Sequence, residues 1–159
     1  DWSKNRLIPD IVRHIFEKQK LIIRSPLGTR PWQHVLDPLT GYLILAQKMS
    51  KESDLFSSVW NFGPDVDSEK TVEWILKEVQ RKSSKIIFET EKAATFKETA
   101  SLTIDSSKAK SVLNWNSSWE AETALVKTME WYDAFYCEKN MINFTLSQIE
   151  EYIVRHEQV

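Results

Sequence analysis

Three arginines stand in or beside loops that contain proline and glycine, namely Arg6, Arg24 and Arg30. The arginine side chain ends in a planar fork of N–H donors, which pairs bidentately with phosphate oxygens. Three such side chains, held by their loops, could form a pocket for a diphosphate or a nucleotide. The same spacing also fits three solvated surface charges, so both interpretations are open on these residues alone.

Other chemistries lack the residues that they need. His14, His34 and His156 lie far apart, and none has a second histidine or a cysteine at ligand spacing, so we expect no metal site. We expect His14 and His156 to face solvent. No GxSxG elbow occurs, and Cys137 falls on an aromatic helix face where a packed thiol is the better interpretation. We therefore place no catalytic residue in this chain.

The sequence also lacks the motifs that bind and use a dinucleotide redox cofactor. The three glycines, Gly28, Gly41 and Gly63, are far apart, which excludes a glycine-rich loop around the phosphates of a dinucleotide. None of the four tyrosines has a lysine four residues later. The chain therefore contains no YxxxK pair.

Composition narrows the partners further. The length of 159 residues suits one domain. The 21 basic and 23 acidic residues give a net charge of −2, so we expect neither nucleic acid nor a membrane as partner. The seven tryptophans could stack on bases, but core packing fits this charge balance better. A single cysteine excludes an internal disulfide and indicates a reducing, cytoplasmic environment. Because the sequence opens at Asp1 without a methionine, we interpret it as a piece of a longer protein.

Hydrophobic spacing predicts an α+β fold of about six helices and four or five short strands. The expected helices are 7–16, 38–49, 69–81, one ending near 113–114, one from 117 or 118 to about 136, and 145–156. The expected strands are 20–24, 33–36, 59–62, 85–89 and 101–104, with loops at 25–31, 51–58 and 91–99.

Polar residues before these helices predict their caps. We assign Asp37, Ser68, Asp105, Ser117 or Ser118, and Thr145 as N-caps, and the last forms a capping box with Gln148. Asn114 suits the left-handed position that ends a helix.

Several segments together resemble one enzyme family. DWSKNRLIPD (1–10), TRPWQHVL (29–36), WNFGP (60–64) and LTIDSSKA (102–109) occur in its order and spacing, followed by Trp115 and by residues 130–132. They look like the C-terminal part of the CDP-glucose 4,6-dehydratases, which are extended short-chain dehydrogenases/reductases. The resemblance covers almost the whole chain.

The resemblance implies a small substrate-binding lobe that works beside an NAD-binding Rossmann domain, which would lie upstream of Asp1. It also implies roles for single residues. Arg6 and Leu7 would close over the nucleotide, Arg24 would lie beside the base and ribose, and Arg30 would bind the diphosphate. Asn61 would line the same phosphate pocket.

Two positions depart from the family pattern. The loop 91–99 carries Lys97 and Glu98 where relatives often have histidine or arginine, so a contact of Lys97 with phosphate is less secure. Asn114 replaces a glycine, which we expect to matter for structure only.

The main hypothesis is a CDP-glucose-binding domain of an NAD-dependent 4,6-dehydratase. One alternative is a domain of another nucleotide-sugar epimerase or dehydratase, and a second is a noncatalytic helical interaction module. The complete enzyme is expected to be a homodimer through its Rossmann lobe, and this chain alone a monomer with an exposed apolar face.

We predict that the chain alone neither binds NAD nor turns over CDP-glucose, because it has neither a glycine-rich loop nor a YxxxK pair. Calorimetric titration of NAD and an assay for the 4-keto product test this. Measurable NAD affinity or turnover by the purified chain would contradict it.

Overall fold

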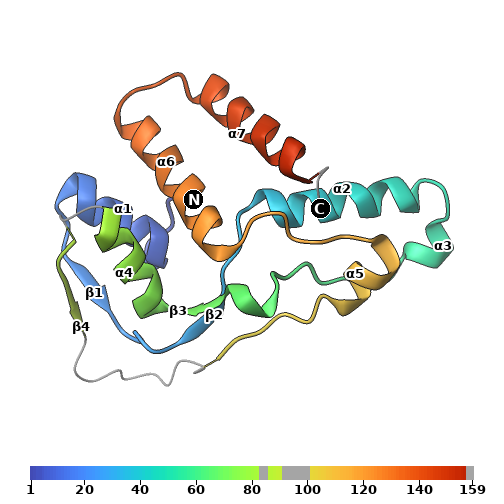
Figure 1. Ribbon diagram of the computed structural model, residues 1–159, viewed down its shortest axis with the longest axis horizontal. Helices are drawn as coiled ribbons and strands as arrows, with labels where there is room; N and C mark the ends of the chain where they lie inside the picture. Colours follow the sequence, from blue (N-terminus) through green and yellow to red (C-terminus); the bar gives the residue numbers. More distant parts are fainter. Residues whose placement is uncertain (83–85, 91–100, 157–159) are drawn as a thin grey trace.

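The computed structural model describes residues 1–82, 86–90 and 101–156. In these residues helices dominate and the strands are three residues long, which confirms the mixed α+β class (Figure 1). The elements, in chain order, are α1 (Leu7–Glu17), β1 (Leu21–Ile23), β2 (Thr29–Pro31), α2 (Leu36–Met49), α3 (Ser53–Phe56), the 3₁₀ helix η1 (Val66–Ser68), β3 (Glu69–Thr71), α4 (Val72–Lys82), β4 (Phe88–Thr90), α5 (Ser107–Leu113), α6 (Ala121–Tyr136) and α7 (Met141–His156).

The strands form two separate pairs. β1 and β4 are parallel, with Leu21 opposite Phe88, and β2 and β3 are antiparallel, with Arg30 opposite Lys70. Figure 1 shows both pairs on one side of the molecule, below α1 and α4, while α6 and α7 form a helical hairpin above them. No helix in the described part of the chain is long and apolar enough to cross a membrane.

Several predictions about strands are wrong. Residues 101–104 form no strand but an isolated bridge from Ser101 to Thr29, and residues 69–71, which we expected at the start of a helix, form β3. Residues 29–31, which we expected in a loop, form β2 because they pair with β3. Residues 33–36 and 59–62 are not strands. The two segments are joined by a side chain instead of a backbone ladder, because the Gln33 amide donates to the Phe62 carbonyl at 2.9 Å. The loop predicted at 51–58 contains the short helix α3.

Hydrophobic side chains gather in separate clusters. The first joins α1, β1, α4 and α6 and includes Ile11, Ile23 and Leu76, each at most 3% exposed. The second joins α2, α3 and α5 around Phe62 and the fully buried Trp115. Gly41 in α2 is required there, because a Cβ at this position would collide with the Phe62 ring.

One of the predicted caps, Ser68, bonds to a different helix from the one expected. Ser68 does not begin a helix; its hydroxyl accepts the backbone N–H of Ala121 at 3.2 Å, at the start of α6. The start of α4 uses Thr71 instead, whose hydroxyl accepts the N–H of Trp74 at 3.1 Å. A long-range contact therefore outweighed the local capping signal of Ser68.

The last helix begins earlier than its capping box predicted. Asn140 accepts the N–H of Asn143 at 3.1 Å, and α7 starts at Met141. Thr145 lies inside the helix, where its hydroxyl accepts the indole N–H of Trp131 at 3.0 Å.

The predicted C-terminal end of α5 agrees with the structure, whereas the residue before the helix is Ser106 rather than the predicted cap Asp105. Asp105 accepts the N–H of Ser107 at 2.9 Å, and Asn114 ends the helix in the left-handed conformation at φ 54°. The start of α6 differs, because the residue before it is Glu120 rather than Ser117 or Ser118.

Asp37 is not an N-cap but a buried carboxylate that joins three segments. It lies in the first turn of α2 with no exposed surface. Its Oδ1 accepts the backbone N–H of Ser118 and the hydroxyl of Tyr152, each at 2.8 Å, while its carbonyl accepts the Trp115 indole N–H at 3.0 Å. Its Oδ2 is buried with no hydrogen-bond partner in the described residues. Burial raises the pKa of Asp37 despite these donors.

The expectation that His14 and His156 face solvent is wrong. Both are partly buried, and His156 Nδ1 lies 2.8 Å from the Ser118 hydroxyl. The N–H of Ile87 donates to His14 Nε2 at 3.1 Å, so the proton of the neutral ring is on Nδ1, which lies 2.6 Å from the Gln19 carbonyl. His14 therefore connects the end of α1 to the chain entering β4.

We expect Tyr152→Phe to lower the free energy of unfolding above the pKa of Asp37 by about 1.5–3 kcal/mol, the usual contribution of a hydrogen bond to a charged group. The loss should be smaller in acid. The raised pKa means that folding favours protonated Asp37, so the charge-assisted part of the bond is present above that pKa and disappears as the pH falls through it.

Urea unfolding at pH 7 and in acid measures both effects. Tyr42→Phe is the matched control, because Tyr42 is 56% exposed on α2. Equal losses for the two variants would show that the Tyr152–Asp37 bond contributes nothing.

Candidate functional site

Four of the predicted binding residues line one cavity. It has a volume of about 460 Å³, and Arg6, Leu7, Arg24 and Arg30 are all part of its wall. These residues come from the start of α1, the chain after β1, and β2. The fold thus brings together side chains that are up to 24 positions apart.

One wall of the cavity is the amino end of α1. Asn5 has a left-handed backbone at φ 62°, and Arg6 after it is extended, which places the first turn of the helix at the cavity. The first N–H groups of a helix have no partner within the helix and carry partial positive charge. This end of α1 therefore adds to the positive potential of the arginines.

Arg24 is joined to the same wall. Its Nη2 donates to Asn5 Oδ1 at 3.3 Å, so the residue that turns the chain into α1 also orients the second arginine. Asn5 was not selected from the sequence, although asparagine is among the residues that adopt left-handed backbone, which was a usable signal.

Arg30 is held by its own strand. Its Nη1 donates to the Thr29 carbonyl at 2.8 Å, and the guanidinium lies beside Gly28. Trp32, which also lines the cavity, anchors the chain after Pro31 because its indole N–H donates to the Lys70 carbonyl at 2.8 Å. Sheet pairing and the indole therefore fix the backbone on both sides of Pro31.

The balance of charge in the cavity is positive. Its wall contains three arginines and one acid, Asp10, and that acid forms an ion pair with Arg13. Guanidinium groups and a helix amino end suit oxygen anions, and the bidentate geometry of arginine suits phosphate in particular. The apolar side chains of Leu7, Ile23 and Val72 supply surface for a less polar part of the same ligand.

Two predicted residues are not part of this arrangement. Asn61 is exposed and is not among the residues that line the cavity. Lys97 lies outside the described residues.

The described residues do not fit a resident metal or NAD. Within the parts described, no group of three or more His, Cys, Asp or Glu side chains could hold a metal ion. Each sheet there has two strands, and no glycine-rich turn connects a strand to a helix, so these residues do not form a dinucleotide cradle.

The fold is similar to part of two larger proteins that were solved with NAD. It superposes with a TM-score of 0.64 on dTDP-glucose 4,6-dehydratase from Bacillus anthracis, solved in complex with NAD, at 22% identity over 84% of this chain and 41% of that one. It also superposes with a TM-score of 0.64 on MoeE5, solved with UDP-glucuronic acid and NAD, at 17% identity over 81% of this chain and 42% of the other.

Sequence comparison gives a more particular relative. The chain is 38% identical over 154 residues to the CDP-glucose 4,6-dehydratase of Salmonella typhimurium, which confirms the resemblance noted in the sequence. The match takes in 96% of this chain and 43% of the relative's length. No family model matches the chain.

The site geometry predicts an effect of Gly28→Ala. The new Cβ would lie 3.2 Å from Arg30 Nη1 and 3.3 Å from the Ser25 carbonyl oxygen, so the guanidinium must move. We expect CDP affinity to fall about two- to tenfold, since an off-rotamer side chain costs about 0.5–1.5 kcal/mol.

Titration calorimetry with CDP measures this effect. Urea unfolding of both proteins separates this effect from a loss of stability, because Gly28 is buried and its carbonyl accepts the Val72 N–H at 3.0 Å. Unchanged CDP affinity would show that Gly28 does not position Arg30.

Proposed function

We propose that this chain is the nucleotide-sugar-binding domain of a CDP-glucose 4,6-dehydratase. The observation that carries the proposal is the convergence of Arg6, Arg24 and Arg30 on one cavity that also receives the amino end of α1. The 38% identity to a CDP-glucose 4,6-dehydratase supports the choice of nucleotide and sugar.

Each residue is proposed to have a separate role. Arg6 and Leu7 close over the nucleotide, Arg24 contacts the base and ribose, and Arg30 pairs with the diphosphate. The Arg30 side chain suits that role because its backbone is fixed by β2 and by the Trp32 indole, so little conformational entropy is lost on binding.

Two further contacts are proposed on the family resemblance alone. Asn61 would approach the phosphates from its exposed segment, and Lys97 would do so from the loop 91–99. Neither contact is part of the cavity described above.

The complete protein is proposed to be an NAD-dependent lyase that converts CDP-glucose to CDP-4-keto-6-deoxyglucose and water. NAD and the catalytic residues would belong to the Rossmann domain, because the described residues have two-stranded sheets only and the sequence has no glycine-rich loop or YxxxK pair. The homodimer contacts are proposed there on the family resemblance alone. We place the enzyme in the cytoplasm, in the supply of deoxysugars for surface polysaccharide such as the lipopolysaccharide O-antigen.

Ligand titration separates this proposal from its alternatives. A preference for CDP over UDP and dTDP supports it, whereas a preference for another nucleotide indicates a different epimerase or dehydratase. If no nucleotide binds, the chain is an interaction module.

Arg30→Ala in the complete enzyme should weaken CDP-glucose binding about ten- to hundredfold, because a charge-assisted hydrogen bond contributes about 1.5–3 kcal/mol. NAD affinity should not change. Arg30→Lys should recover part of the loss, since an ammonium keeps the charge but not the fork.

Calorimetric titrations of CDP-glucose and NAD into wild type and both variants provide the measurement. Arg155→Ala is the matched control, because Arg155 is exposed on α7 and does not line the cavity. Equal CDP-glucose affinity in wild type and both Arg30 variants would place Arg30 outside the binding site.

A further inference from the structure

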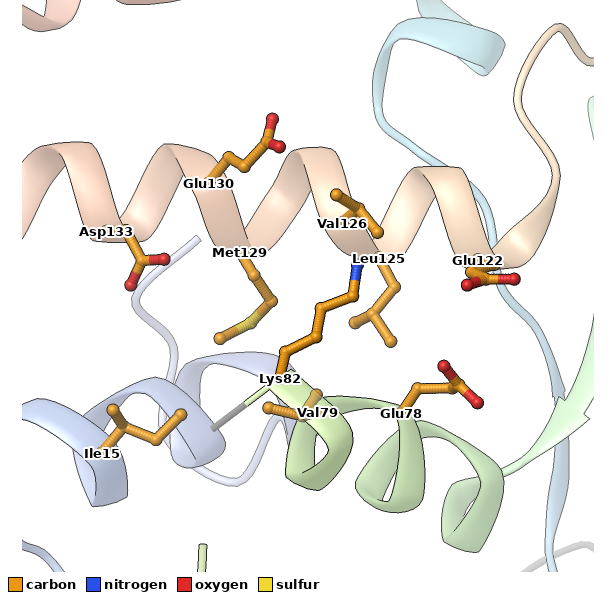
Figure 2. Close-up of a pocket in the computed structure, with 10 residues that line it drawn as sticks. All are labelled: Ile15, Glu78, Val79, Lys82, Glu122, Leu125, Val126, Met129, Glu130 and Asp133. Atoms are coloured by element: carbon orange, nitrogen blue, oxygen red, sulfur yellow. The ribbon is translucent and has the colours of Figure 1, made fainter. Parts of the chain in front are cut away.

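A second cavity lies between α4 and α6 and shares no residue with the arginine-lined one. Its volume is about 200 Å³, and α1 contributes Ile15 to its wall (Figure 2). Most of its floor is hydrocarbon from Val79, Leu125, Val126 and Met129. Val79 and Leu125 belong to the buried core, so this floor is held in place by the fold.

Most of the carboxylates around this cavity are already paired. Arg81 Nη2 lies 2.7 Å from Glu78 and 2.6 Å from Glu122, and Lys127 lies 3.3 Å from Glu130. Figure 2 shows the Glu130 side chain directed away from the cavity, whereas Asp133 is directed toward it.

Asp133 differs from these paired acids. Among the described residues its carboxylate has neither an ion pair nor a hydrogen bond, although it lines the cavity. Burial and the charge of Glu130 raise the pKa of Asp133, and they outweigh the opposite effect of the Lys139 charge. A cation at this end of the cavity would stabilise the charged form.

A cationic side chain lies further along the cavity, between Asp133 and the paired acids Glu78 and Glu122 (Figure 2). Lys82 lines the cavity and in Figure 2 extends from α4 toward Leu125 and Val126, with its ammonium group beside them. Its ammonium group likewise has no ion pair within the described ranges. Leu125 and Asp133 are eight residues apart on α6, which corresponds to about 12 Å along the helix.

The cavity therefore presents an acid, a hydrocarbon floor and a base in that order. We propose that it binds a small zwitterion whose two charges are separated by a hydrocarbon chain, as in an ω-amino carboxylate. The ligand ammonium group lies against Asp133, its methylene chain covers Met129 and Leu125, and its carboxylate group meets Lys82.

Four small molecules of nearly equal size test this arrangement. 6-Aminohexanoate has both charges at opposite ends, its isomer 2-aminohexanoate has both at one end, and hexylamine and hexanoate have one charge each. We expect 6-aminohexanoate to bind about two- to fivefold tighter than any of the other three, as an exposed ion pair contributes up to about 1 kcal/mol.

The location of binding can be read from methionine methyl groups. In the chain labelled with ¹³C at its three methionines, the Met129 signal should shift during the titration. Met49 at the end of α2 and Met141 at the start of α7 do not line the cavity, and their signals should stay in place.

Two substitutions assign the charges. Asp133→Asn should reduce the affinity of 6-aminohexanoate to that of hexanoate, and Lys82→Gln should reduce it to that of hexylamine. Asp54→Asn and Lys51→Gln are matched exposed controls on or next to α3, and they should have no effect. Three results would each overturn the proposal. The Met129 signal could show no saturable shift, all four molecules could bind with equal affinity, or both cavity variants could still prefer 6-aminohexanoate.

Discussion

A carboxylate with no exposed surface, Asp37, holds together the parts of the molecule that lie far apart in the sequence. The carboxylate accepts the Ser118 N–H and the Tyr152 hydroxyl, and the backbone carbonyl of the same residue accepts the Trp115 indole N–H. Asp37 thus connects the first turn of α2 to the segment before α6 and to α7. A buried carboxylate is stable only when hydrogen-bond donors surround it. Removal of one donor leaves the carboxylate with too few partners, which costs free energy. The geometry of these three segments is therefore fixed by one side chain.

The arginine-lined cavity depends on this constraint through the short segment between β2 and α2. Only a few residues separate Arg30 in β2 from Asp37, and they include the buried His34. Burial, with the charge of Lys127, lowers the pKa of His34 to about 4, so its ring is neutral near pH 7. Its Nδ1 accepts the Leu36 N–H at 3.3 Å. The chain that leaves the arginine strand thus enters α2 in one conformation.

Local sequence signals predicted the elements well where they agreed with long-range packing. The apolar repeat of α1 and the end of α5 at Asn114 are examples. Asp37, Ser68 and Thr145 look like caps in sequence, but each is bonded to a residue at least 14 positions away. Such partners cannot be derived from local spacing.

In the candidate site, too, local sequence signals identified the residues but not their long-range contacts. The arginines were selected by residue type and loop context, and the family resemblance favoured a phosphate-binding role over solvated charges. Their convergence depends on the β2–β3 register and on the left-handed turn at Asn5, which local patterns do not specify. The second cavity gave no sequence signal, since Lys82 and Asp133 are ordinary helix surface residues until α4 and α6 pack together.

The parallel pairing of β1 with β4 has a consequence for the order of folding. Leu21 and Phe88 are far apart in the chain, and a three-residue ladder repays little of the entropy lost when such a long loop closes. Helices α1 and α4 form largely from local contacts and can be present earlier. Since β1 is also a wall of the arginine cavity, that cavity is completed only in a late step of folding.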